Sequence, residues 1–500
     1  MHLSYHIPQG VSEKTHHGHP ALSTKQGGLI LLDSVMLEIW RSANGKALNE
    51  MLASSPAPDT STIPLRAALA CLAEADLLER EQEYPSSSYD EIKTGPLVSV
   101  VLVSYNSQPW LKICLPSLSK QNYTPYEIIL VDNGSTDDSV QWVSKNFPAV
   151  KLVTLEKTRP LSKAINCGVT EAKGEFYLLL NPDLKLSPDA IANMVSSING
   201  DQNIAAVAPK LKLMWAPAFL NGLGNFVGSI SWGTDIGLGH LDLGQFENWT
   251  EVPSACFAAT LISASVWNAV GPVDEGFPLY YEDSEWCYRA RQQGYTIRAA
   301  PDAVIYHAFG SRTSLEKGGS LTPEKLQYVS YGRLRFAVKL LSRSYLIRFL
   351  SMYFLEDSLN TIYSIMRGRW KNIRAYFRAW TGFLNNLSLL RNERKHLQEQ
   401  RKKTDRDLFT LQKKIPMPLI RYGFPLLTWD LVLQTYLPLF VGSQGHILPE
   451  FEEDFIQAAK NQTIPVPALL NRLTKIYKVD GIKGLLFRIG RLIQWKLIHP

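Results

Sequence analysis

Three apolar runs of the sequence end abruptly in polar side chains that could do chemistry. The runs cover residues 98–103, 128–131 and 176–180. Ser104 and Tyr105 follow the first run, Asp132 follows the second, and Asn181 and Asp183 follow the third. Carboxylate oxygens, such as those of Asp183, are ligands for hard divalent cations.

The intervals between these runs predict the elements that position the polar residues. Apolar residues recur at helical spacing between the first two runs, and again from 161 to 172. The runs themselves are apolar on both faces, which is typical of parallel strands covered by helices. Because ligands bind at the carboxyl ends of such strands, the sequence predicts an α/β domain with its chemistry along one edge of the sheet.

Five motifs in this region resemble, in the same order, those of family 2 glycosyltransferases, which have the GT-A fold. They read Val-Leu-Val-Ser-Tyr-Asn at 101–106, Val-Asp-Asn-Gly-Ser-Thr-Asp at 131–137, Leu-Asn-Pro-Asp at 180–183, Gly-Pro-Val-Asp-Glu at 271–275 and Tyr-Glu-Asp-Ser-Glu-Trp-Cys-Tyr-Arg at 281–289. The Asn-Pro-Asp of the third motif is most similar to the rhamnosyltransferase-like group. The resemblance implies a mostly parallel sheet flanked by helices, and transfer of a sugar from a nucleotide-diphosphate donor.

The resemblance implies that the residues after the first two strands bind a dTDP- or UDP-sugar. Ser104 and Tyr105 match positions that contact the base and ribose, and Asp132 matches the aspartate that accepts the ring N–H of thymine or uracil. An Asx turn that closes on Gly134 is another role for Asp132, and the two roles are compatible. Arg159, where relatives usually have glycine, is either a cation for the donor phosphate or a solvated loop charge.

A divalent cation, Mg²⁺ or Mn²⁺, is also implied, because the leaving diphosphate must be neutralised. Asp183 matches the last acid of the family's metal-binding motif, whereas Asn181, a further donor-binding candidate, replaces the first acid. His307 ends a strand-like run in the position where relatives have another ligand. The alternative for Asp183 is a turn or helix-capping role before Pro188, and the alternative for His307 is a structural role.

The acceptor side is predicted from an acidic motif and a glycine-rich stretch. Glu282 and Asp283 open a helix, where the helix dipole alone also favours acidic side chains. By resemblance Asp283 is the general base that deprotonates the acceptor hydroxyl, which implies direct displacement with inversion. Glu282 is assigned to the acceptor side, and Trp232, within the glycine-rich stretch 221–244, is a candidate ring for stacking on a sugar.

A chain of 500 residues is too long for one core and predicts several domains. Residues 1–83 resemble a PqqD-like, winged-helix peptide-binding module, with a structural cap as the alternative. Residues 84–95 form a polar linker, and residues 96–314 form the GT-A domain. The five scattered cysteines favour neither a disulfide scaffold nor a zinc site and indicate a reducing compartment. The N-terminus lacks the pattern of a secretory signal.

The positive charge is concentrated in residues 315–500. This region has 30 basic and 14 acidic side chains, a balance of +16 in a chain whose net charge is +6. Cations such as Arg333, Arg335 and Lys339 interleave with aromatic residues at helical spacing, which predicts amphipathic helices at a membrane surface. Nucleic acid is the rival ligand, but no recognisable module for it is present, so we expect none to bind. The most apolar stretch, 424–441, contains an aspartate and two prolines and predicts an interfacial or buried helix.

The combined prediction is an inverting, metal-dependent glycosyltransferase that is peripheral to the cytoplasmic face of a membrane. Its partners are a nucleotide-sugar donor and a glycan acceptor, lipid-linked, in cell-surface polysaccharide synthesis. The alternative is a non-catalytic protein on a degenerate transferase fold that binds a glycan or a peptide. Retention of Asp132, Asp183, Asp283 and His307 together argues against degeneracy. The N-terminal resemblance leaves a peptide or protein acceptor open.

Overall fold

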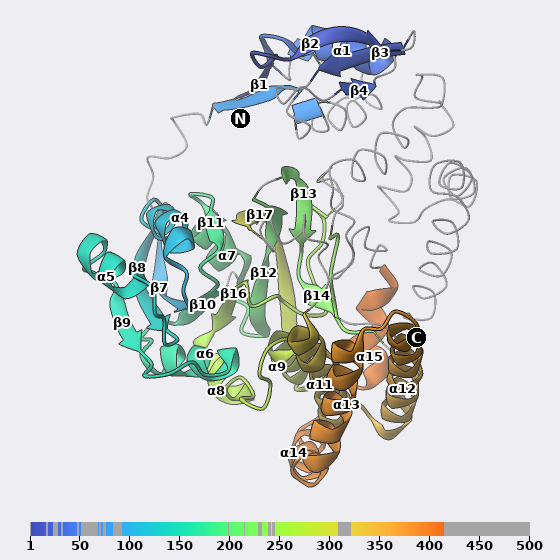
Figure 1. The fold of residues 1–500 in the computed structure, drawn as a ribbon. Coiled ribbons are helices and arrows are strands. Elements are labelled where there is room, and N and C mark those ends of the chain that lie inside the picture. The colour runs from blue at the N-terminus through green and yellow to red at the C-terminus, as the bar shows by residue number, and fades with distance from the viewer. Residues whose placement is uncertain are drawn as a thin grey trace.

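Three groups of elements follow one another along the chain (Figure 1). The computed structural model describes residues 2–16, 19–23, 29–31, 34–47, 50–51, 69, 72–73, 77–83, 93–198, 200–214, 216–228, 233–238, 242, 246–308 and 322–414. The first group lies in the predicted N-terminal domain, the second in the predicted transferase domain, and the third in the basic C-terminal region.

The N-terminal group is a small α+β unit. Its elements are β1 (His2–His6), β2 (Ser12–His16), β3 (His19–Ser23), β4 (Leu29–Leu31), α1 (Ser34–Ala43), β5 (Lys46–Ala47) and β6 (Glu79–Glu83). β1 pairs with β5 and β6, and β3 pairs with β2 and β4, all antiparallel. Trp40 of α1 is buried with Tyr5 and Leu22, and its indole Nε1 donates to the Leu77 carbonyl at 2.8 Å. The PqqD-like resemblance of this unit stays a prediction.

The central domain is built on one sheet with the strand order β11-β17-β12-β16-β10-β7-β8-β9, and β13 pairs with β12. The strands are β7 (Lys93–Ser104), β8 (Tyr123–Asp132), β9 (Lys151–Thr154), β10 (Phe176–Leu180), β11 (Leu184–Leu186), β12 (Ile204–Leu213), β13 (Ala216–Gly222), β16 (Ala259–Ser263) and β17 (Thr296–His307). The three predicted strands, β7, β8 and β10, are parallel neighbours. β11, β13 and β16 run antiparallel to the strands beside them, and the other strands share one direction, so the sheet is mostly parallel, as predicted.

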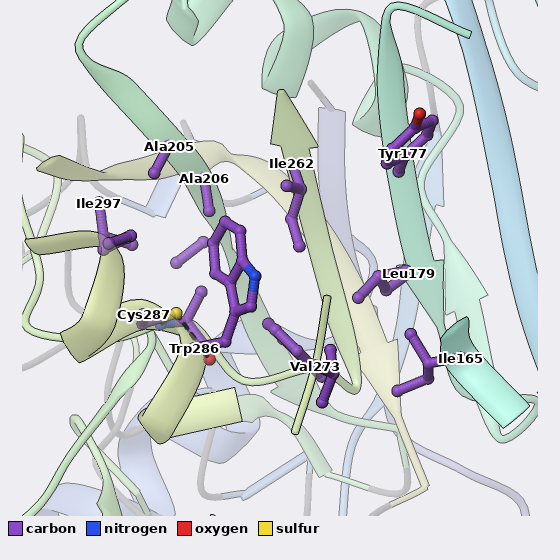
Figure 2. Packing of buried hydrophobic residues seen from close by; sticks show 14 of the residues in the cluster. Ile165, Tyr177, Leu179, Ala205, Ala206, Ile262, Val273, Trp286, Cys287 and Ile297 are labelled. Carbon is purple, nitrogen blue, oxygen red and sulfur yellow. Dashed lines mark hydrogen bonds between the residues drawn. The ribbon is translucent and has the colours of Figure 1, made fainter. Parts of the chain in front are cut away.

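Helices cover both faces of this sheet. They are α4 (Gln108–Leu118), α5 (Ser139–Asn146), α6 (Leu161–Thr170), α7 (Ala190–Ile198), α8 (Ala264–Val270) and α9 (Glu282–Gln292). Along β7, Val100 and Leu102 pack in the core shared with α4 and α7, whereas Val101 and Val103 pack in the core shared with α6, α8 and α9. Figure 2 shows Trp286 of α9 within this second core. Burial of both faces explains why the strand is apolar at successive positions.

The C-terminal group packs on the α9 side of the central domain (Figure 1). It consists of α11 (Pro323–Leu340), α12 (Arg343–Met366), α13 (Trp370–Asn385), α14 (Leu387–Glu399), α15 (Asp405–Phe409) and a 3₁₀ turn (Thr410–Lys414). α11 contacts α12, α13, α14 and α9, and its Phe336 shares a core with Phe277 and Tyr288 of the central domain. These helices are therefore part of the same folded body as α9.

Three of the cations that the sequence assigned to a membrane-facing surface are buried instead. Arg333, Arg335 and Lys339 lie on α11, and each forms ion pairs with acidic side chains. That prediction was wrong because helical spacing does not reveal which face of a helix meets protein. Of the helices in the described residues, none is long and apolar enough to cross a bilayer. The stretch 424–441 lies outside the described residues.

Candidate functional site

Ser104 and Asp132 lie opposite each other at the ends of β7 and β8. Both are buried, and Ser104 Oγ and Asp132 Oδ1 have no hydrogen-bond partner among the described residues. The other carboxylate oxygen of Asp132 accepts from the Ser135 amide at 3.1 Å. Asp132 thus closes a turn with one oxygen and leaves the second available to a ligand N–H. Tyr105, which follows Ser104, is 51% exposed at this edge.

Two asparagines without a predicted role hold the loop after β8. Asn106 has a left-handed φ of 48°, and its Oδ1 accepts from the Thr136 amide at 2.8 Å. Asn133 Oδ1 accepts from the Arg159 amide at 2.8 Å, and its Nδ2 donates to the Arg159 carbonyl at 3.0 Å. Arg159 is therefore tied by its backbone to the Asp132 loop, with an exposed side chain. Asparagine tolerates the left-handed region, so its position directly after a strand is the signal that could have revealed Asn106.

Asp183 and His307 meet where β11 pairs with the end of β17. Leu184 lies opposite His307 in this antiparallel ladder. Asp183 Oδ2 is 3.3 Å from His307 Nε2, and the other ring nitrogen, Nδ1, is 2.5 Å from Asn221 Oδ1. Because an amide oxygen can only accept, Nδ1 carries the proton, and in the neutral ring Nε2 presents its lone pair on the Asp183 side. Burial opposes ionisation of Asp183, but when Nε2 is protonated as well, its hydrogen bond to Asp183 and the positive charge of the ring outweigh burial and lower the pKa of the Asp183 carboxyl.

The donor atoms of Asp183 and His307 fit a divalent cation. A carboxylate oxygen and an imidazole nitrogen lie side by side, and Mn²⁺ or Mg²⁺ accepts oxygen ligands with an imidazole among them. Within the part of the chain that the structure describes, no three His, Cys, Asp or Glu side chains are grouped to hold a metal. An ion here would therefore need further oxygens from a diphosphate or water. Asn181 precedes this point, and its backbone amide is fixed by the Ala258 carbonyl at 2.8 Å.

A polar network extends from this pair toward Asp283, across two short paired strands. The strands are β14 (Asn225–Phe226) and β15 (Thr234–Asp235). Asn221 Nδ2 donates to Asp235 Oδ2 of β15 at 3.1 Å, which fixes the orientation of the Asn221 amide. Asn225 Nδ2 of β14 donates to Asp283 Oδ2 at 2.8 Å. The sequence prediction missed Asn221 and Asn225, although both lie in the glycine-rich stretch. Trp232 of that stretch lies outside the described residues.

The backbone that enters α9 is strained. Tyr280 and Tyr281 both have φ near 70°, in the left-handed region that bulky side chains rarely adopt. Such strain is concentrated at functional sites because the surrounding structure must hold it. The turn presents Asp283 in the first turn of α9, where its Oδ1 accepts from the Ser284 amide at 2.6 Å.

Glu282 and Asp283 are adjacent carboxyls that cannot both ionise easily. Burial raises the pKa of Glu282 to about 8, and the charge of Asp283 adds to this effect. Burial also raises the pKa of Asp283. Asp283 accepts several hydrogen bonds that favour its ionised form, whereas Glu282 Oε2 has no partner among the described residues. The shared proton therefore resides on Glu282, and Asp283 is the carboxylate that can act as a base.

Helix α11 braces the strained turn and α9. Gly332 of α11 packs so closely that a Cβ there would lie 3.0 Å from Tyr281 Cδ2. The Tyr281 hydroxyl in turn accepts from the Gly233 amide at 2.8 Å. Lys339 Nζ of α11 lies 2.9 Å from Glu285 Oε1 of α9, and both side chains are buried. Lys339 of α11 thus supports α9 from within the protein.

The sheet, the polar edge of β7 and β8, and the carboxylates near β11 and α9 define a nucleotide-diphospho-sugar transferase domain of the GT-A fold. Residues 99–215 match the model of the family described as glycosyl transferase family 2. This stretch of the central domain is accordingly similar to family 2 glycosyl transferases, the family that the sequence motifs resemble.

Similar proteins with assigned activities include two glycosyltransferases. The chain is 28% identical over 204 residues to the low-salt glycan biosynthesis hexosyltransferase Agl10 of Haloferax volcanii, which is 40% of this chain and 63% of that protein. It is 24% identical over 237 residues to the N-acetylglucosaminyl-diphospho-decaprenol L-rhamnosyltransferase of Mycobacterium tuberculosis, which is 42% of this chain and 76% of that protein.

Two further similarities cover less of the relative or lie at lower identity. The uncharacterized protein y4gI of Sinorhizobium fredii is 35% identical over 113 residues, which is 22% of this chain and 12% of that protein. The chain thus spans less than two thirds of the length of y4gI and of Agl10. Among solved structures, the mannosyltransferase PcManGT from Pyrobaculum calidifontis, in complex with GDP-Man and Mn²⁺, aligns with 73% of this chain and 97% of its own, at 16% identity and a TM-score of 0.39.

Proposed function

We propose that this chain is an inverting, metal-dependent glycosyltransferase that transfers a hexosyl group, such as rhamnosyl, from a dTDP- or UDP-sugar to a hydroxyl of a glycan. The observation that carries the proposal is a pair of sites supported by neighbouring residues of the paired strands β14 and β15. They are a cation-type pair, Asp183 and His307, and a supported base, Asp283. The family 2 domain and the names of the two similar glycosyltransferases support sugar transfer in glycan synthesis.

Donor recognition is assigned to the ends of β7 and β8. Asp132 Oδ1, buried and without a partner among the described residues, accepts the ring N–H of uracil or thymine, and Ser104 Oγ supplies a second polar contact beside it. Tyr105 has the exposed ring to lie against the base or ribose. Arg159, exposed and tied to the same loop, is placed to attract the donor phosphates.

Asp183 and His307 would hold the divalent cation, with Asn181 beside them on the donor side. A bound cation supplies charge neutralisation for the diphosphate that leaves. Asp183 would bind as an ionised carboxylate, as a metal ligand must be. The Asn221 contact keeps the proton of His307 on Nδ1, so that Nε2 can act as a ligand.

Asp283 removes the proton of the acceptor hydroxyl while the hydroxyl oxygen attacks the anomeric carbon of the donor sugar. The attack comes from the side opposite the diphosphate, so the configuration inverts and a single base suffices. Glu282, protonated on the acceptor side, keeps a second negative charge away from Asp283. The acceptor is proposed to be lipid-linked, at the cytoplasmic face of a membrane. Support for this comes from the +16 balance of residues 315–500.

Release of nucleoside diphosphate by the purified full chain tests the proposal. A panel of dTDP-, UDP- and GDP-sugars is incubated with Mn²⁺ or Mg²⁺, and slow hydrolysis without acceptor identifies the donor. We expect Asp183→Ala and chelator to abolish turnover, and Asp283→Asn to abolish transfer to an acceptor. Asp138→Asn, an exposed aspartate near the donor edge that makes no side-chain cap, is the matched control and should be silent.

The outcomes separate the parts of the proposal. If calorimetry shows donor binding but no metal supports turnover, the protein is a non-catalytic nucleotide-sugar or glycan-binding protein and not an enzyme. If turnover survives both chelator and Asp183→Ala, the reaction does not depend on a metal. An α-linked product from an α-linked donor, seen in the anomeric proton spectrum, would contradict inversion.

A further inference from the structure

Helix α12 is apolar on two opposite sides. One side packs into the protein through Phe349 and Tyr353, whose hydroxyl donates to the Gly228 carbonyl at 2.9 Å. The other side is exposed and carries large apolar residues at helical spacing. They are Ile347, Phe354, Leu355, Leu359, Ile362, Ile365 and Met366. Met366 is 78% exposed and Phe354 62% exposed, values that are unusual for residues of this kind.

The start of α13 continues this surface. Trp370 is 64% exposed and Phe377 is 70% exposed. Phe354 of α12 contacts Trp380 of α13 with ring centroids 5.7 Å apart, so the exposed residues of the two helices belong to a packed helix pair. We call the exposed apolar residues of α12 together with Trp370 and Phe377 the α12–α13 face.

Every exposed charge along this face is positive. The exposed cations are Arg343, Arg348, Arg367, Arg369, Lys371, Arg374 and Arg378. The acidic residues between positions 343 and 391 are Glu356 and Asp357, and both are bound to the buried Arg333. No acidic side chain among the described residues forms an ion pair with any of the seven cations. Arg367 and Arg369 lie over the Tyr363 ring, 5.6 and 5.9 Å from its centroid.

We propose that the α12–α13 face docks on an anionic lipid bilayer. Aliphatic and aromatic side chains ringed by unpaired cations suit the boundary between headgroups and acyl chains. Nucleic acid would use the cations and rings but would leave the aliphatic residues in water. A second copy, related by a two-fold axis, would bring like charges together. The face is distinct from the α11 cations Arg333, Arg335 and Lys339, which are buried and paired with acidic side chains within the protein.

The inference deepens the proposed function, because docking on a bilayer would give the transferase access to a lipid-linked acceptor. This purpose of docking rests on the proposed function, whereas docking itself does not. Co-sedimentation of the full chain with vesicles tests it without donor or acceptor. The vesicles contain phosphatidylcholine alone or mixed with phosphatidylglycerol. We expect binding to the mixed vesicles and little binding to phosphatidylcholine alone, with salt weakening the attraction.

Two variants test the two parts of the face. Arg367→Gln, Arg369→Gln and Arg374→Gln together should weaken partitioning about 100-fold, because each cation contributes about fivefold at an anionic surface. Leu359→Ser, Ile362→Ser and Met366→Ser together should weaken it at least about tenfold, because apolar contacts with the acyl region are lost. Lys120→Gln with Lys145→Gln, and Leu389→Ser, change exposed residues elsewhere and should bind as the parent does.

Three results would overturn the inference. The first is equal vesicle binding by the parent and both face variants. The second is absence of vesicle binding together with oligonucleotide binding that only the charge variant weakens. The third is a concentration-dependent dimer, seen by sedimentation, that the serine variant dissolves. Circular dichroism and donor hydrolysis report whether each variant is folded, so failure of the proposed function and failure of lipid docking are told apart.

Discussion

Removal of the Asn225 side chain should move the pH dependence of transfer to higher pH. Asn225 is buried, and its Nδ2 donates to Asp283 Oδ2 at 2.8 Å. A hydrogen bond to a charged group contributes about 1.5–3 kcal/mol, and a change of about 1.4 kcal/mol corresponds to a tenfold change in an ionisation constant. Because the bond favours the ionised carboxylate, its loss in Asn225→Ala raises the pKa of Asp283 and weakens its ionisation about 10- to 100-fold.

The sign follows from the role of Asp283 as a base, since only its ionised form reacts. The acidic limb of kcat/KM against pH should therefore move upward, and the rate well below the new pKa should fall by about the same 10- to 100-fold. At high pH the rates of the variant and parent should converge. Asn225→Asp, which puts a like charge beside Asp283, should move the limb further in the same direction.

The assay is transfer to an acceptor measured across pH with the parent, Asn225→Ala and Asn225→Asp. Asn193→Ala removes a surface amide that donates to the Asp302 carbonyl and serves as the control, with no expected change in the limb. An acidic limb that stays in place or moves downward would refute the reasoning. A uniform loss of rate at all pH values would instead mean that Asn225 supports the fold of the site.

Three further predictions concern the support of the acceptor side. Folded Glu282 has a pKa of about 8 against an ordinary 4.5, so the native state holds this proton more tightly and loses stability as pH rises between these values. Glu282→Gln should therefore raise Tm at pH 8 but not at pH 4, and equal gains at both would contradict this. Gly332→Ala crowds Tyr281, so it should lower the free energy of unfolding, measured with denaturant, by about 1–3 kcal/mol and should lower kcat. Gly382→Ala in α13 meets only ordinary contacts and should leave the free energy of unfolding unchanged or raise it. Lys339→Met breaks a buried ion network and should lower the free energy of unfolding by about 3–5 kcal/mol in the same assay. A loss of under about 1 kcal/mol would show that the network is not needed for stability.

The polar edge at the ends of β7 and β8 was predictable because its signals are local. An unbroken apolar run indicates a strand buried on both faces, and the polar residue after it must emerge at the strand end. Ser104 and Asp132 do lie side by side at neighbouring strand ends. Asp183 and His307 are far apart in the sequence, and the order of the motifs indicated their common site. The structure then brought their side chains to 3.3 Å.

The supporting residues were not predictable, because their roles depend on contacts between distant segments. Asn221 and Asn225 are ordinary polar residues in a glycine-rich stretch, and only the pairing of β14 with β15 and the approach of α9 give them partners. The acidic motif indicated that a helix begins near Glu282. The left-handed conformation of Tyr280 and Tyr281 was not indicated, since no local preference of tyrosine favours it.

The sequence by itself determined the class of domain, the edge that carries its chemistry and the concentration of positive charge in the last third of the chain. The tertiary structure decided how that charge is divided. Arg333 and Lys339 are buried because acidic side chains of neighbouring helices and of α9 meet them, whereas Arg367 and Arg374 are exposed beside apolar residues. Cations at helical spacing look alike in a sequence, and only the packing of one helix against another separates those that hold a protein together from those that face outward.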